Sequence, residues 1–174
     1  MEVTRFEDIQ AEFMDRVSQA VYGTLATVDR QNRPRSRVVH PIWEAHIGWL
    51  ISWPASHKAK HLARNPAVSL AYMPDKAKPV YVDAIAEWID AAEQQQRIWD
   101  LHAATPPPLG FDPQPHYQTI DHPYFGLLRL TPNRVSEIAE QCGFNSIYHF
   151  SRAFQQTYGV SPRAYRHGAE AKRN

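Results

Sequence analysis

The chain is short of the residues that build disulfides, membrane spans and secretion signals. Cys142 is the single cysteine among 174 residues, so no intrachain disulfide can form and a reducing compartment is expected. No stretch approaches the roughly 18 consecutive apolar residues of a membrane span. The first residues lack the basic and apolar regions of a secretory signal. We therefore expect a cytoplasmic protein that makes no membrane contact.

Excess charge is also nearly absent, since the formal net charge is +1. Residues 1–134 hold 14 Lys and Arg against 15 Asp and Glu, whereas residues 135–174 hold five against three. Such a small basic surplus at the end of the chain permits contact with nucleic acid without establishing it. The apolar fraction of 43% and the charged fraction of 21% are ordinary for a folded protein, which excludes extensive disorder.

Hydrophobic periodicity predicts antiparallel strands interrupted by helices. The predicted strands cover residues 22–28, 35–42, 48–53, 67–73, 78–88 and 125–131. A first helix is expected over 8–20, with an apolar face that lies across the sheet. Two more are expected over 56–64, capped by Ser56, and over 91–101, capped by Asp90. This order is typical of a small barrel that is mainly β, with helices outside.

Proline is concentrated in one place. Five of the 14 prolines lie in residues 105–116, so we expect a loop or lid there with no regular element running through it.

The stretch from Arg35 to Pro66 carries the clearest chemical signal. It contains two strand-like runs followed by a basic helix that begins Ser56-His57-Lys58. Backbone N–H groups at a helix start, together with cationic side chains, favour a phosphate. The sequence therefore predicts a pocket for a phosphorylated ligand. His57 and His61 also have a spacing found in metal sites, but no third ligand lies nearby in the sequence, and we predict no metal.

The order R-x-R-V-V, strand, S-H-K-x-K-x-L-x-x-N-P-x-V-S-L resembles the pyridoxamine 5′-phosphate oxidase-like family of FMN-binding split barrels, over about residues 11–135. The resemblance implies an FMN-binding domain over residues 1–134, an oxidoreductase activity and a homodimer with the flavin at the subunit interface. A deazaflavin in place of FMN stays open. The cofactor-binding residues that it implies are Arg37, Val38, Val39, Ser52, Trp53, Ser56, His57 and Lys58.

Two features of this chain depart from the family pattern. The family often has Arg where this chain has His57, and a neutral imidazole is a weaker clamp. A further strand normally follows a segment such as 127–132, and that segment is missing here. If the barrel has lost its last strand, an exposed sheet edge and poor solubility are expected. Trp53 and Tyr72 are aromatic residues that could edge a pocket for a flat ring.

Residues 135–174 have the pattern of two short helices around a glycine turn. Gly143 supplies the turn, Ser146 caps the second helix, and Cys142 belongs to the small core. The residue pattern resembles the second helix-turn-helix of AraC-type transcription regulators, over about residues 135–166. That resemblance implies contact with double-stranded DNA through Ser146, Ile147, Tyr148, His149, Ser151 and Arg152, with Arg163 or Arg166 near phosphates.

AraC-type domains hold two such units, and this chain holds one, which is too small to fold confidently alone. Two hypotheses for function therefore remain. The first is an FMN-dependent oxidoreductase, for which no side chain stands out as a catalytic acid or base. The second is a ligand- or redox-responsive DNA-binding regulator, in which a dimer supplies two helix-turn-helix units. A fused remnant that packs on the barrel without touching DNA is the alternative for the tail.

Overall fold

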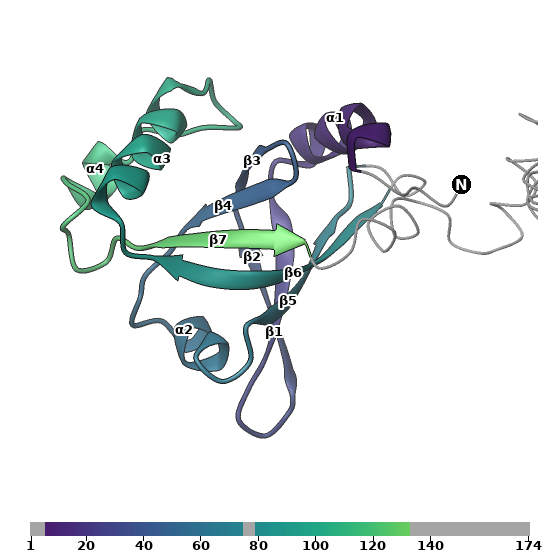
Figure 1. Ribbon diagram of the computed structural model, residues 1–174, viewed down its shortest axis with the longest axis horizontal. Helices are drawn as coiled ribbons and strands as arrows, with labels where there is room; N and C mark the ends of the chain where they lie inside the picture. The colour runs from purple at the N-terminus through teal and green to yellow at the C-terminus, as the bar shows by residue number, and fades with distance from the viewer. Residues whose placement is uncertain (1–5, 75–78, 133–174) are drawn as a thin grey trace, which may run out of the picture.

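The computed structural model describes residues 6–74 and 79–132. Within them, seven strands form one sheet in the order β2-β1-β5-β6-β7-β4-β3, and all neighbours are antiparallel (Figure 1). The strands are β1 (Gly23–Val28), β2 (Pro34–Val39), β3 (Ile42–Glu44), β4 (Ile47–Ile51), β5 (Ala67–Tyr72), β6 (Val80–Ile89) and β7 (Leu127–Pro132). The prediction of a mainly β split barrel with flanking helices is confirmed for this part of the chain.

The two edge strands, β2 and β3, are consecutive in the sequence. The prediction of one strand over 35–42 is wrong, because His40 and Pro41 separate β2, which pairs with β1, from β3, which pairs with β4. Proline has no N–H to give to a sheet ladder, so the strand ends before it. The two-residue link joins opposite edges of the sheet, and the strands curl into a half-barrel.

The three predicted helices are found with shifted ends, and two further short helices were not predicted. They are the 3-10 turn η1 (Phe6–Asp8), α1 (Gln10–Ala20), α2 (His57–Leu62), α3 (Ala92–Ala104) and α4 (Gln114–Tyr117). Ser56 caps α2 as predicted, whereas α3 begins after Ala91, which makes no side-chain cap, instead of Asp90. The loop predicted over 105–116 contains the start of α4, because Pro115 lies in a first turn, where its missing N–H is not needed.

The inner face of the half-barrel is filled by alternate strand residues and by α1. Phe13 and Val17 of α1 are 1% and 4% exposed and join the same apolar cluster as Leu25 and Leu70. The ring of Phe13 meets Trp43 edge to face, with centroids 4.9 Å apart. The predicted position of the first helix against the barrel is thus confirmed: its apolar residues join the core, and α1 lies at one end of the sheet (Figure 1).

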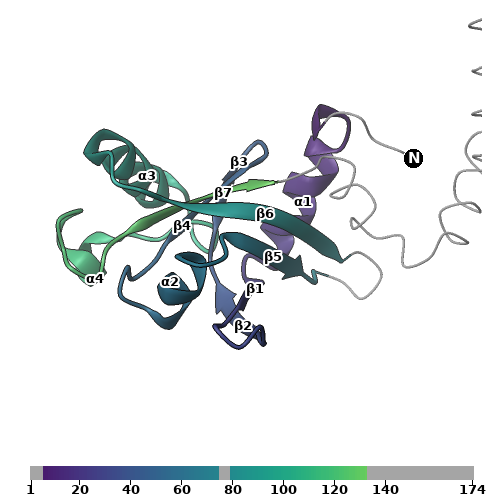
Figure 2. The ribbon, with the colours of Figure 1, turned by 60° about the horizontal axis from the view of Figure 1, so that its bottom comes forward.

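A second apolar cluster lies on the outer face, under α3. It consists of Ile42, Trp49, Ile98 and Leu127, with Ile98 and Leu127 fully buried. Figures 1 and 2 both place α2 and α3 on opposite sides of strands β6 and β7. The two helices therefore occupy different environments on the same barrel.

The strand β7 is not an edge of the sheet. It pairs with β4 on one side and with β6 on the other, so its backbone groups are shared with two neighbours. The exposed edge expected from the missing last strand is therefore not found at β7. The buried residues Leu128 and Leu130 fix this strand in the inner core.

The predicted tail lies outside the described residues. This holds for the helix-turn-helix residues Ser146, Ile147, Tyr148, His149, Ser151 and Arg152, for Arg163 and Arg166, and for Cys142. In the described part of the chain, no helix is both long enough and apolar enough to cross a membrane.

Candidate anion-binding site

The helix α2 is held against the sheet by two apolar residues one turn apart. Ala59 and Leu62 are 8% and 5% exposed, and the Oγ of Ser56 accepts a hydrogen bond from the N–H of Ala59 at 3.4 Å. With that side of the helix buried, Lys58 and His61 are half-buried beside it and His57 is exposed. The helix thus carries four basic side chains at the edge of the barrel, because Lys60 is exposed as well.

The strand β2 directs its residues alternately to the two faces of the sheet. Arg37 lies opposite Leu25 on the inner face, and its Nη1 donates to the Oγ1 of Thr27 at 2.8 Å. Val38 faces outward and is 71% exposed, whereas Val39 faces the core and is 7% exposed. Of the three residues predicted here, only Arg37 therefore directs a polar side chain toward α2; the valines can offer backbone groups.

Arg37 lies close enough to Lys58 to affect its protonation. Burial lowers the pKa of Lys58, and the positive charge of Arg37 lowers it further. Burial also lowers the pKa of Arg37. Two like charges in a partly desolvated place destabilise one another, so a negative group between them would be favoured.

No protein carboxylate supplies that negative group within residues 6–74 and 79–132. The ion pairs of this part of the chain join Arg16 to Glu12, Arg33 and Arg35 to Asp29, Arg97 to Glu44, and Arg129 to Glu87. Neither Arg37 nor Lys58 takes part in one. Half-buried cations without a carboxylate partner are the groups that an anion-binding site requires.

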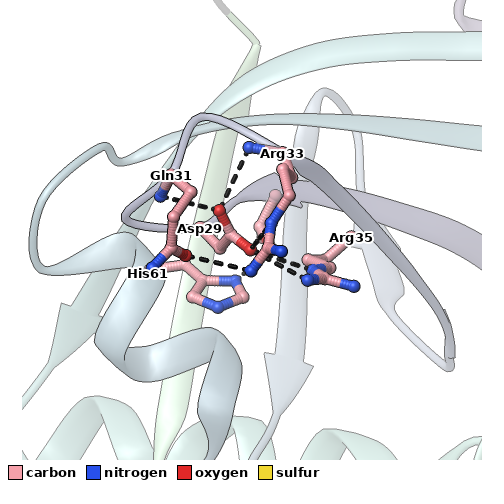
Figure 3. A network of polar contacts seen from close by, with 6 residues as sticks. Asp29, Gln31, Arg33, Arg35 and His61 are labelled. Carbon is pink, nitrogen blue, oxygen red and sulfur yellow. Dashed lines mark hydrogen bonds and ion pairs between the residues drawn. The ribbon is translucent and has the colours of Figure 1, made fainter.

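A polar network around Asp29 holds the β1–β2 turn beside this site (Figure 3). The Asp29 carboxylate accepts from the backbone N–H of Gln31 at 2.8 Å and of Arg33 at 3.1 Å, and from the Nε atoms of Arg33 and Arg35. Burial would raise the pKa of Asp29, but these donors together hold it well below its usual range. The turn is thus fixed by a permanently charged carboxylate.

The hydroxyl of Thr27 connects the strand to the helix. Its Oγ1, which accepts from Arg37, lies 2.9 Å from the Nδ1 of His61, and Thr27 itself is 1% exposed. Sequence reasoning missed Thr27 and Asp29 and considered His61 only as a metal ligand. A threonine on the inward register of a strand, next to Leu25, was the available signal. In the described residues, no three His, Cys, Asp or Glu side chains gather into a metal site.

The remaining predicted residues divide into three kinds. Ser52 is 4% exposed, and its hydroxyl has no partner in the described part of the chain. Trp53 is 46% exposed and meets Tyr124 edge to face, so its ring is accessible. The hydroxyl of Ser56 caps α2.

Tyr72 does not edge a pocket, and that prediction is wrong. Its side chain is 1% exposed, and its hydroxyl accepts from the Nε1 of Trp43 at 2.9 Å. Tyr72 lies on the inward register of β5, between other core residues, so it belongs to the packing of the barrel.

The family model for pyridoxamine 5′-phosphate oxidase matches residues 9–139, which is most of the chain. The chain belongs to this family. Solved structures with the same fold include a Clostridium acetobutylicum protein of the pyridoxinephosphate oxidase family (TM-score 0.59, 15% identity, 72% of this chain and 84% of that one). The heme storage protein HutZ of Vibrio cholerae (0.57, 21%, 72% and 91%) and an F420 reductase (0.51, 17%, 69% and 92%) also match. At these identities the likeness shows the fold alone.

A second family model, that of AraC-type bacterial regulatory helix-turn-helix proteins, matches residues 128–167. The chain is 50% identical over 40 residues to the HTH-type transcriptional regulator MtrA of Neisseria gonorrhoeae, which is 23% of this chain and 13% of that protein. It is 44% identical over 45 residues to the transcriptional activator RhaS of Enterobacter sp. (strain 638), covering 26% and 16%. The chain thus spans less than a fifth of the curated relatives that it matches. The match begins inside β7, so the barrel and the AraC-like segment share the residues of this strand.

Proposed function

We propose that the protein binds FMN with its phosphate between Arg37 and Lys58 and acts as an FMN-dependent oxidoreductase. The observation that carries the proposal is the pair of half-buried cations, without a carboxylate partner in the described residues, at the positions where the family resemblance expects the phosphate. An arginine fork and a lysine charge together neutralise a phosphate monoester.

Neighbouring groups suit the rest of a flavin. The strand β2 is an edge strand, so its outer backbone groups are not used by another strand of the described sheet. The buried hydroxyl of Ser52 offers a hydrogen bond, and the accessible ring of Trp53 can border a flat ring system. FMN would supply the redox chemistry, while these residues bind and orient it and exclude water. A deazaflavin is the alternative cofactor, since a fold neighbour is an F420 reductase.

A homodimer belongs to this proposal. Val38 is 71% exposed on the outer face of the edge strand that also carries Arg37. Covering this residue with a second copy would bury apolar area next to the edge strand that carries Arg37. The cytoplasmic location predicted from the single cysteine is consistent with an enzyme that uses a reduced flavin.

The test is the visible absorbance of the purified chain after incubation with FMN and removal of free flavin by gel filtration. A stoichiometric flavin spectrum that elutes at the size of a dimer is the expected result. Loss of all flavin on the column would contradict the proposal, and retention of a deazaflavin alone would replace FMN with that cofactor. Riboflavin serves as the matched probe, because it lacks only the phosphate.

A second candidate function rests on the AraC-family match, and is a DNA-binding regulator with the barrel as sensor. We propose Arg152, with Ser146, Ile147, Tyr148, His149 and Ser151, as the DNA-contacting residues. A salt-dependent mobility shift of duplex DNA that is lost in Arg152→Ala is expected if this function is present. A shift that Arg152→Ala leaves intact would assign the binding elsewhere.

A further inference from the structure

We propose that His61 is a third cation of the phosphate site, charged on ligand binding and positioned by Thr27. The inference rests on the proposed FMN site and adds to it a pH-dependent affinity. No part of the family resemblance assigns a role to either residue. We infer both roles from the contacts between β1, β2 and α2.

The first step is the direction of the hydrogen bonds. Arg37 is an obligatory donor, so the Oγ1 of Thr27 accepts from it at 2.8 Å. The single hydroxyl proton of Thr27 is then free to point at the Nδ1 of His61, 2.9 Å away. This arrangement requires a neutral imidazole with its proton on Nε2. Thr27 therefore orients the guanidinium of Arg37 and joins it to His61 through one hydroxyl group.

The second step is what happens when His61 takes up a proton. Its Nδ1 becomes a donor, and the Thr27 oxygen must then accept from both His61 and Arg37. The hydroxyl of Thr27 keeps its proton but no longer donates it to His61, so the O–H can donate to a bound anion instead. Protonation therefore adds one positive charge and one donor to a place that already holds Arg37 and Lys58.

The third step is the balance of charges that face His61. They are Asp29 at the end of β1, Arg35 and Arg37 on β2, and His57 on the same helix. Burial lowers the pKa of His61, Arg37, His57 and Arg35 lower it further, and Asp29 alone opposes them. Because Asp29 is already paired with Arg33 and Arg35, the free site favours a neutral His61. A bound phosphate would reverse that balance, so binding takes up a proton.

The expected consequence has a definite sign. The affinity of the wild type for FMN, relative to that of a variant without the imidazole, rises as the pH falls through the raised pKa of His61 in the complex, by up to about tenfold per pH unit, until His61 is charged in the free protein as well. His61→Asn keeps a hydrogen-bond acceptor near the Nδ1 position but cannot be charged, and should lose this extra gain. Thr27→Val should weaken FMN binding severalfold at every pH while leaving riboflavin binding unchanged.

The experiment measures FMN fluorescence quenching between about pH 5 and pH 8 for the wild type, His61→Asn and the control His46→Asn. His46 is an exposed imidazole on the β3–β4 turn, outside the site. The FMN phosphate takes up a proton in the same range, with a pKa of about 6, but equally in all three proteins. The ratio of wild-type to His61→Asn affinity therefore isolates His61. A ratio that grows as the pH falls supports the inference.

Two outcomes separate failure of this inference from failure of the proposed function. FMN binding with a constant ratio overturns the role of His61 and leaves the flavin site intact. If neither the wild type nor the variants bind FMN, the proposed function fails, and the role of His61 is then tested with sulfate in place of FMN. An NMR titration of the His61 imidazole should then show a higher pKa with sulfate than without it; an unchanged pKa overturns the third-cation role.

Discussion

The side of the barrel that carries α2 and the side that carries α3 differ in how their cationic side chains are paired. On the α3 side, Arg97 forms a two-pronged ion pair with Glu44, with both nitrogen–oxygen distances below 3 Å. On the α2 side, Arg37 and Lys58 lie near one another, and neither forms an ion pair with a carboxylate of the described residues. On the α3 side the arginine is paired with a carboxylate, whereas on the α2 side these two cations have no carboxylate partner in the described residues.

The two arginines differ in what their guanidinium groups contact. Glu44 also accepts from the Nε1 of Trp49, so its ion pair fastens α3 to the outer core beneath it. Arg37 instead donates to a hydroxyl, which orients the guanidinium without neutralising it. Partial burial without neutralisation costs stability, and a ligand that removes the cost gains affinity.

The largest effect is expected from His102, the buried imidazole of the α3 side. It is fully buried, neither ring nitrogen has a hydrogen-bond partner in the described residues, and burial lowers its pKa to about 4, with His40 adding to the shift. The folded state therefore resists protonation more than the unfolded state does. Stability should be full above the unfolded pKa of about 6.5 and fall by about 3 kcal/mol as the pH drops to about 4.

Urea unfolding at several pH values measures this loss, and His102→Leu is the comparison variant. The variant lacks the titrating group, so its free energy of unfolding should fall less steeply with acid than that of the wild type. Equal slopes in the two proteins would show that His102 is not the acid-sensitive group of the α3 side.

The next effect tests the α2 side. Arg37→Met should weaken FMN binding by about 1.5–3 kcal/mol, the value of a charge-assisted hydrogen bond, which is about ten- to a hundredfold in Kd. Riboflavin binding should be unchanged. Arg129→Met is the matched control, because Arg129 is another half-buried strand arginine but is paired with Glu87. Equal losses of FMN affinity in the two variants would show that the unpaired arginine contributes no more to FMN binding than the paired one, and would contradict the prediction.

The sequence predicted the fold well wherever one residue type decides a local structure. Alternating apolar residues located β1, β5 and β6, and Ser56 located the start of α2. It failed at two boundaries. At His40 and Pro41 it missed the change of partner, because β2 pairs with β1 and β3 pairs with β4. In the proline-rich segment it missed α4, because Pro115 lies in a first turn, where its missing N–H is tolerated.

The candidate site was predicted in part for the same reason. Arg37 and Lys58 follow from a linear motif, and the structure brings them together. Thr27 and Asp29 belong to a different strand, and their place beside α2 is a product of pairing between β1 and β2. Tyr72 looked like a pocket aromatic because its type fits one, whereas its register on β5 sends it into the core. Side-chain type was readable from the sequence, and direction was not.

The smallest effect should come from breaking the completed ion pair of the α3 side. Glu44→Gln removes the charge but keeps an acceptor for Trp49. Because the Glu44 and Arg97 side chains are 37% and 46% exposed, the expected cost is at most about 1 kcal/mol. The hydrogen bonds from Arg97 lower the pKa of Glu44, so this contribution is present above the unfolded pKa and lost as the pH falls through the folded one. FMN affinity should not change. In urea unfolding, a deficit of the Glu44→Gln protein relative to the wild type that is present at neutral pH and disappears in acid, together with unchanged FMN binding, would confirm that this pair is structural. A loss of flavin would instead place both sides of the barrel in one functional unit.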